Sequence, residues 1–351
     1  MCEGYVVYNR DGASVPIDYP TWTSAGDLRL GRTVGQPAAG RSFHHGRFVM
    51  RLREAARTLT GNVTMVEGTV LDLIEEGGVV LGAVYKTIDK DSRIATVRRV
   101  LAPLTVDCTG CFSRLRKRLT SATPSYSSHF VALLLRGVKL PHQRFAYVML
   151  ARPAPVLCYE IASGEVRVLV NVPDPLPSVS NGDLKRHLLD TVLPQLPEFF
   201  KEPFERTVCS NDPSDSVRSV PCQILPTAAV QRLGALCLGD SLNMRHPLTG
   251  GGMTVALSDV ALLARLLRPI ADLSADRKRV FDAVAHLYDE RRNTASTINI
   301  LSEALYDVFC GGSCNPALET VQQACFDYFP SYGSHWYVNL CKKKFFFIYL
   351  F

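Results

Sequence analysis

The sequence of 351 residues lacks the short motifs by which several large enzyme classes are recognised. No G-x-G-x-x-G, with a helix behind it and an acidic residue about 20 positions on, precedes the first predicted strands, so a βαβ unit that holds a dinucleotide pyrophosphate is not predicted. The sequence has no G-x-S-x-G and no Ser-His-Asp grouping, which excludes the common serine hydrolase arrangements. No lysine follows the glycines Gly250–Gly252, so they are not a phosphate loop of the G-x-x-x-x-G-K-[ST] type.

Signals for secretion, disulfide bonds and metal binding are also missing. Met1–Gly4 has neither the basic segment nor the apolar core of a signal peptide. The 11 cysteines are odd in number and scattered, which predicts reduced thiols in a cytosol-facing protein. Cys108 and Cys111 have C-x-x-C spacing without a second such pair, and the adjacent His44 and His45 have no partner one helical turn away. We therefore expect no metal site.

The charge is not concentrated as it is in proteins that bind nucleic acid. The formal net charge is +6, and lysine and arginine are scattered except in 114–118 and 342–344. No RNP, zinc-finger or helix-turn-helix pattern is present, so nucleic acid is not an expected partner. The final stretch, Lys342–Phe351, is basic and then apolar. Its apolar part is far shorter than the about 20 residues that span a bilayer, but it suits a membrane surface.

What the sequence does contain is a strand, a glycine loop and a helix within Gly234–Leu267. A short apolar run predicts a buried strand that ends at Gly239-Asp240. The helix predicted after the glycines Gly250–Gly252 has apolar residues at i, i+3, i+4 spacing: Met253, Ala256, Leu257, Val260, Leu263, Ala264 and Leu267. Glycines let a backbone approach a ligand, and a helix N-terminus offers free N–H groups and a positive dipole end. The pattern favours a ligand site, with a plain helix cap and turn as the alternative.

The remaining patterns predict a mixture of strands and helices. Strands are predicted at 4–8, 63–66, 69–74, 79–87, 93–100, 104–106, 130–135 and 166–170, with hairpin turns at Asp11-Gly12 and Gly77-Gly78. Helices are predicted at about 47–58, 183–192, 275–310 and 316–329. The chain therefore belongs to the mixed α/β (α+β) class.

The string GDSLNMRHPLTGGGMTVALSD, residues 239–259, closely resembles the second flavin-binding motif of the squalene monooxygenase (squalene epoxidase) family. The resemblance implies a para-hydroxybenzoate-hydroxylase-like FAD-binding fold. It implies that Asp240 holds the ribityl hydroxyls of FAD, that Met253 contacts FAD, and that the helix N-terminus behind Gly250, Gly251 and Gly252 faces the pyrimidine edge of the flavin. FAD is therefore the expected cofactor.

Two further cofactor contacts are implied by resemblance. The segment Gly40–Phe48 is similar to the family segment that crosses the FAD domain, which implies that Arg53 contacts FAD, with Arg47 nearby as a weaker candidate. A solvated helix face is the alternative for both arginines. Val70 lies where the family places a backbone contact to the adenine side of FAD.

Asp107–Arg116 resembles the Asp-Gly motif of these hydroxylases, which lies by the flavin and the pyridine-nucleotide approach. Thr109 stands at the position of the motif aspartate. Asp107 lies two residues earlier and would point to the same face of a strand. Whether Asp107 replaces the missing carboxylate stays open at this point.

The resemblance also implies a substrate pocket and a division of the chain. Tyr5 matches the family tyrosine near flavin and substrate, with a half-buried strand tyrosine as the alternative. Leu133, Leu135, Pro247 and Leu248 are the candidates for an apolar substrate cavity. We expect the remainder of an FAD-binding domain at 1–124, a β-rich substrate domain at 125–230, the flavin motif and its helix at 231–270, and a helical, membrane-associated region at 271–351.

The activity implied is FAD-dependent epoxidation of squalene to (S)-2,3-oxidosqualene in sterol biosynthesis, with electrons from NADPH through a partner flavoprotein reductase. The implied location is the cytosolic face of the endoplasmic reticulum membrane. Relative to the family the chain is expected to be truncated at both ends, without the first βαβ unit and the C-terminal apolar helices. The alternatives are a catalytically silent, membrane-associated product of this ancestry and another flavin monooxygenase of the same fold.

Overall fold

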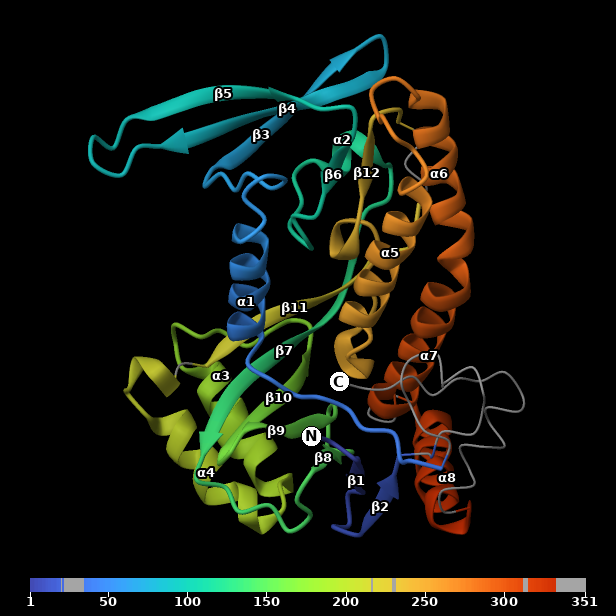
Figure 1. Ribbon diagram of the computed structural model, residues 1–351. Coiled ribbons are helices and arrows are strands. Elements are labelled where there is room, and N and C mark those ends of the chain that lie inside the picture. The colour runs from blue at the N-terminus through green and yellow to red at the C-terminus, as the bar shows by residue number, and fades with distance from the viewer. Residues whose placement is uncertain (20, 22–34, 216, 229–231, 312–314, 333–351) are drawn as a thin grey trace.

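The computed structural model describes residues 1–351 except 20, 22–34, 216, 229–231, 312–314 and 333–351 (Figure 1). The basic and apolar segment Lys342–Phe351 lies outside the described residues. The described residues combine a large mixed sheet with two smaller ones and a set of helices, which confirms the mixed α/β class.

The large sheet has seven strands in the order β11-β7-β10-β9-β8-β1-β2. Its strands are β1 (Gly4–Tyr8), β2 (Ser14–Asp18), β7 (Ser125–Arg136), β8 (Phe145–Met149), β9 (Val156–Ala162), β10 (Glu165–Pro173) and β11 (Arg218–Ile224). Neighbouring strands are antiparallel except β1 and β8, which run parallel. Residues 4–18 were expected to belong with the rest of 1–124, but hydrogen bonding from β1 to β8 places them in this sheet.

Alternating side chains give the large sheet two buried faces. One face packs under α3 (Asp183–Arg186), the π-helical turn His187–Val192, the short helix Leu193–Gln195 and α4 (Glu198–Cys209). The other face packs against α7 (Arg292–Gly311) and α8 (Pro316–Tyr332). Figure 1 shows α3 and α4 at the lower left of the sheet, with α7 and α8 at the lower right. A ligand between sheet and helices would therefore lie in one of two separate layers.

The other half of the molecule carries the smaller sheets. An antiparallel sheet consists of β3 (Thr69–Glu76), β4 (Val79–Ile88) and β5 (Ala95–Leu101), and β6 (Thr105–Asp107) pairs in parallel with β12 (Ala235–Cys237). Helices α2 (Arg116–Leu119), α5 (Gly252–Leu267) and α6 (Arg277–Glu290) accompany the parallel pair. Helix α1 (His45–Arg57) lies below the β3–β5 sheet in the view of Figure 1 and has no buried residue.

Most predicted elements occur within a few residues of their expected ends. Gly77 and Gly78 form the β3–β4 turn with positive φ, as the hairpin signal predicts. The expected strand at 63–66 is absent, and the helical pattern at 275–310 is divided into α6 and α7 at Arg291. No helix within the described residues is long and apolar enough to cross a membrane.

Candidate active site at the ends of the parallel strands

The parallel strands β6 and β12 end side by side, and each leads into a polar loop. The register pairs Cys237 with Asp107, so the loop after β12 begins beside the loop after β6. In α/β sheets ligands bind outside the carboxyl ends of parallel strands. This edge therefore unites the two segments that the sequence marks as flavin motifs, Asp107–Arg116 and Gly239–Gly252.

Arg116 holds the two loops together. Its side chain is buried and donates hydrogen bonds to backbone carbonyl oxygens of both loops, at distances of 2.8 to 3.1 Å. The acceptors are the carbonyl oxygens of Gly110, Cys111, Asp240 and Ser241. A guanidinium carries several donors in a fixed plane, which suits it to gather carbonyl groups that no strand partner satisfies.

Asp107 serves the loop that follows β6 rather than a ligand. It is buried, and its carboxylate accepts from the Thr109 backbone N–H at 2.9 Å, from the Thr109 hydroxyl at 2.6 Å and from the Ser113 hydroxyl. Thr109 itself is exposed. The carboxylate oxygens of Asp107 are therefore engaged by groups of its own loop.

Asp240 is the accessible acid of this edge. Its side chain reaches solvent, yet surrounding protein raises the pKa of its carboxyl, while Arg245 and Arg116 act in the opposite direction. Among the described residues no hydrogen bond to this carboxylate is recorded, in contrast to the fully engaged Asp107. Asp240 is therefore placed to accept hydrogen bonds from a ligand that enters the edge.

The glycine loop ends at the N-terminus of α5, as expected. Gly250 has φ +59°, a conformation that favours glycine. Gly251 is the residue before α5, and no side chain among the described residues caps this helix, so its first N–H groups have no side-chain partner there. Met253 lies half-buried in the first turn. The structure thus brings Asp240, the glycines and Met253 to one edge.

The need for Gly251 comes from helix packing. A Cβ built on Gly251 would lie 2.5 Å from Cγ2 of Ile298 in α7, whereas one on Gly252 has its nearest neighbour, Nη1 of Arg245, at 3.7 Å. Gly251→Ala is expected to lower the free energy of unfolding by about 1–3 kcal/mol through overpacking. Gly252→Ala is the matched control and is expected to change it by less than about 1 kcal/mol. Urea unfolding of both variants checks this, and equal effects would contradict the packing argument.

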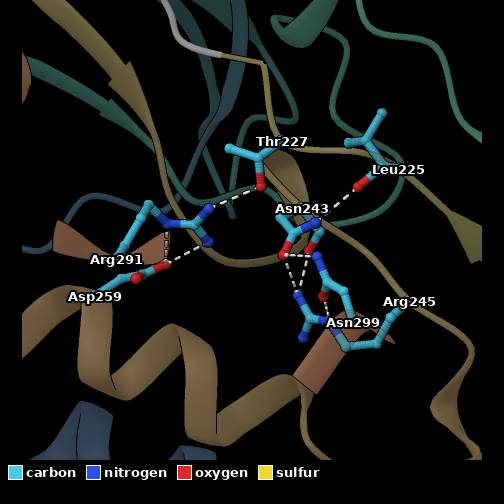
Figure 2. A network of polar contacts seen from close by, with 7 residues as sticks. All are labelled: Leu225, Thr227, Asn243, Arg245, Asp259, Arg291 and Asn299. Carbon is cyan, nitrogen blue, oxygen red and sulfur yellow. Dashed lines mark hydrogen bonds and ion pairs between the residues drawn. The ribbon is translucent and has the colours of Figure 1, made fainter. Parts of the chain in front are cut away.

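Two groups of buried polar contacts lie behind the loop, and they involve α5, α7 and the residue between α6 and α7. Figure 2 shows their members: Leu225, Thr227, Asn243, Arg245, Asp259, Arg291 and Asn299. Arg291 pairs with Asp259 through Nε and Nη2 at 3.1 and 2.9 Å, and both side chains are almost fully buried. Arg245 donates to the side chains of Asn243 and Asn299, at 2.6 Å each. The group around Arg245 therefore links the loop to α7 through Asn299, and the group around Arg291 links α5 to the junction of α6 and α7.

The turn Pro247–Thr249, just before the glycines that lead into α5, faces the large sheet. Leu248 is buried in an apolar cluster with Phe130 of β7 and Phe326 of α8, and Tyr5 packs against the same cluster. The structure therefore brings Tyr5 and Leu248 together, while Pro247 is exposed. We call the group Val7, Ile17, Phe130, Val148, Leu150, Leu157, Cys222, Leu248 and Phe326 the sheet–helix cluster.

Leu133 and Leu135 do not join Leu248, and the expectation of a shared cavity is wrong for these two residues. Both are fully buried in the other layer, with Phe200 and Phe204 of α4. The reason is the period of two in a strand: Phe130 faces the sheet–helix cluster, so Leu133 and Leu135, at odd spacing from it, face the opposite side.

Arg53 and Val70 are both exposed side chains outside the two loops of the site edge. Arg53 is exposed on α1, and Val70 is exposed on β3. Arg47, the weaker candidate, lies on the same exposed helix. The described residues show no hydrogen bond or ion pair from these two arginines, so their cofactor contacts stay predictions.

Comparison with known proteins agrees with this geometry. A family model for squalene epoxidase matches residues 101–340. The chain belongs to the squalene epoxidase family. It is 43% identical over 326 residues to "Squalene monooxygenase SE1" of Panax ginseng, covering 93% of this chain and 56% of that protein. It is 40% identical over 328 residues to "Squalene monooxygenase" of Mus musculus, covering 93% of this chain and 53% of that protein. The chain thus spans about half the length of these relatives.

Solved structures share the fold at low sequence identity. The p-nitrophenol 4-monooxygenase PnpA of Pseudomonas putida DLL-E4 has a TM-score of 0.66 at 14% identity, covering 93% of this chain and 76% of that one. HpxO of Klebsiella pneumoniae, complexed with FAD and uric acid, has a TM-score of 0.63 at 14% identity, covering 93% of this chain and 77% of that one. The fold of this squalene epoxidase family member is therefore that of FAD-dependent monooxygenases, as expected.

Sequence reasoning about this squalene epoxidase family member missed several site residues. Arg116 and Ser241, which join the two loops, lie within the two motifs but were not singled out as site residues, because their contacts cross between segments far apart in sequence. The pair Asp259 and Arg291 lies 32 positions apart and meets only in the folded chain. The side of the sheet on which Leu133 lies could have been predicted from strand alternation once the side of Phe130 was known.

Proposed function

We propose that the chain is the flavin-contacting and substrate-covering part of an FAD-dependent squalene monooxygenase, which epoxidises squalene to (S)-2,3-oxidosqualene. The observation that carries the proposal is the single turn Pro247–Gly252. On one side this turn leads to the uncapped N-terminus of α5 beside Asp240, and on the other side it inserts Leu248 into the sheet–helix cluster. One segment is thus shared by a polar edge and an apolar layer.

The residues present fit the flavin end of FAD. The carboxylate of Asp240 is accessible and suits hydroxyl donors, and the α5 N-terminus suits a flavin ring that carries negative charge when reduced. Bound and reduced, FAD supplies the activation of dioxygen, from which one oxygen atom reaches the alkene. The aromatic and aliphatic side chains of the sheet–helix cluster, such as Phe130 and Phe326, would hold a hydrocarbon and exclude water from the reacting end.

Family membership supports the remaining parts of the proposal. These are the supply of electrons from NADPH by a flavoprotein reductase, and attachment to the cytosolic face of the endoplasmic reticulum membrane. The turnover of squalene is tested by its products: NADPH oxidation that yields no epoxide in the reconstituted system would count against this substrate.

Asp240→Ala is expected to weaken retention of FAD by about tenfold or more, because a charged acceptor contributes about 1.5–3 kcal/mol to a hydrogen bond. The measurement is the flavin absorbance that stays with the purified chain through gel filtration. Asp282→Ala, which changes an exposed acid on α6, is the control and is expected to retain FAD like the unchanged chain. Equal FAD content in the Asp240 variant would exclude the role. A chain that never retains FAD would favour a catalytically silent protein.

A further inference from the structure

One buried arginine beside the glycine loop is held by neutral groups alone within the described part of the chain. The side chain of Arg245 is buried, with an exposed fraction of 7%. A guanidinium stays protonated at physiological pH, and a buried charge without a counter-charge is costly. The other buried arginine of Figure 2, Arg291, is neutralised by Asp259 at 2.9 Å. The positive charge of Arg245 therefore calls for an explanation that packing does not supply.

The partners of Arg245 are the oxygen atoms of two asparagines. Nε donates to Oδ1 of Asn299 in α7 at 2.6 Å, and Nη2 donates to the carbonyl oxygen and Oδ1 of Asn243 at 3.1 and 2.6 Å. The orientation of the Asn243 amide is fixed independently, because its Nδ2 donates to the carbonyl oxygen of Leu225 at 2.8 Å (Figure 2). These contacts hold the guanidinium in one place without cancelling its charge.

The third nitrogen of the guanidinium lies at the start of α5. Nη1 has no hydrogen-bond partner among the described residues, and it lies 3.7 Å from the position that a Cβ of Gly252 would take. Gly252 is the first residue of α5, and no described side chain caps this helix. The positive end of the helix dipole and the charge of Arg245 therefore lie together.

Asp240 is the acid that acts on this charge from the site edge. Burial lowers the pKa of Arg245, the Asp240 carboxylate raises it, and the charges of Arg291 and Asp259 act in opposite directions. Among the described residues Arg245 and Asp240 form no ion pair, so each keeps its capacity to interact with a ligand. The edge thus offers a carboxylate to hydroxyl groups and, separately, a positive end at α5.

This combination suits a ligand that has hydroxyl groups next to an anionic ring. Resting on the proposed function, we propose that the charge of Arg245 makes the edge bind reduced FAD, whose flavin ring is negatively charged, more tightly than oxidised FAD, whose ring is neutral. Arg245 acts on the ring through its electric field across the first turn of α5, and Asn243 and Asn299 are the positioning residues that hold it there.

The test measures the affinity of the purified chain for both forms of FAD. Oxidised FAD is titrated by its fluorescence, and FAD reduced with dithionite is titrated anaerobically. Arg245→Gln is expected to lower the ratio of the reduced to the oxidised affinity by about tenfold, as the loss of a full charge within about 10 Å does at a partly buried site. For a two-electron couple this equals a decrease of about 30 mV in the reduction potential of the bound flavin, which dye equilibration measures independently.

Three further variants separate the charge of Arg245 from its role in packing. Arg245→Lys keeps the charge and is expected to keep the ratio within about threefold of the unchanged chain. Asn299→Asp keeps the arginine but places a carboxylate against its Nε, so the ratio is expected to decrease as in Arg245→Gln. Arg265→Gln is the control, because it removes an exposed charge in the last turn of α5, and it is expected to leave the ratio unchanged.

The outcomes distinguish this inference from the proposed function. FAD that is bound with the same ratio in Arg245→Gln or in Asn299→Asp as in the unchanged chain overturns the inference and leaves the proposed function intact. An equal loss of both forms in Arg245→Gln and Arg245→Lys also overturns it, because the arginine would then only support the loop. Binding of neither form by the unchanged chain overturns both. Circular dichroism verifies folding, and Asn299→Asp decides the matter if Arg245→Gln does not fold.

Discussion

Asp259→Ala is expected to lower the free energy of unfolding by about 3–5 kcal/mol, a large part of the stability of a typical domain. Asp259 lies on α5 and pairs with Arg291, which stands between α6 and α7. Both side chains are almost fully buried, so the truncation leaves the guanidinium charge without its counter-charge inside the protein. The remaining partner, the hydroxyl of Thr227 at 2.8 Å, is neutral and cannot compensate.

The control for this prediction removes both charges. Asp259→Leu combined with Arg291→Met replaces the pair by apolar side chains and is expected to stay within about 2 kcal/mol of the unchanged chain. Urea unfolding of the single and double variants measures the difference. Equal free energies of unfolding for the single and double variants would contradict the prediction, because they would show that leaving Arg291 without its counter-charge has no cost.

Arg116→Leu is expected to lower the free energy of unfolding by at least about 3 kcal/mol. The same variant is expected to retain less FAD. The substitution leaves the buried carbonyl oxygens of the two loops without the donor that gathers them. Because the loops after β6 and β12 would then separate, Asp240 and the α5 N-terminus would lose their common position. Thermal unfolding and flavin retention are measured on the same sample.

Arg118→Leu is the matched control for Arg116→Leu. Arg118 lies in the same short helix and pairs with Asp72 and Glu75 on the surface, at 2.9 and 3.4 Å. Exposed ion pairs contribute about 0–1 kcal/mol, so this variant is expected to be nearly as stable as the unchanged chain and to retain FAD. Similar decreases in stability and in FAD retention in the two variants would show that the effect comes from disturbing α2 rather than from losing the contacts of Arg116 with the carbonyl oxygens.

The sequence by itself determined the parts of the site that are continuous along the chain. The strand, the glycine loop and the helix of Gly234–Leu267 depend on local signals: an apolar run, glycines and a 3.6-residue period. The long motif around Asp240 also identified the family, which the comparisons confirm. The expected helix at 47–58 and hairpin at Gly77-Gly78 occur for the same reason, since each is encoded by neighbouring residues.

Only the tertiary structure decided which distant residues meet. The face of β7 on which Leu133 lies depends on which helices pack on each side of the sheet, and the pattern of a strand buried on both faces does not reveal it. The place of β1 beside β8, the gathering of carbonyl groups by Arg116 and the pairing of Asp259 with Arg291 join segments far apart in sequence. A buried charge or amide is stable only with its partner, and that partner is chosen by the packing of the whole chain.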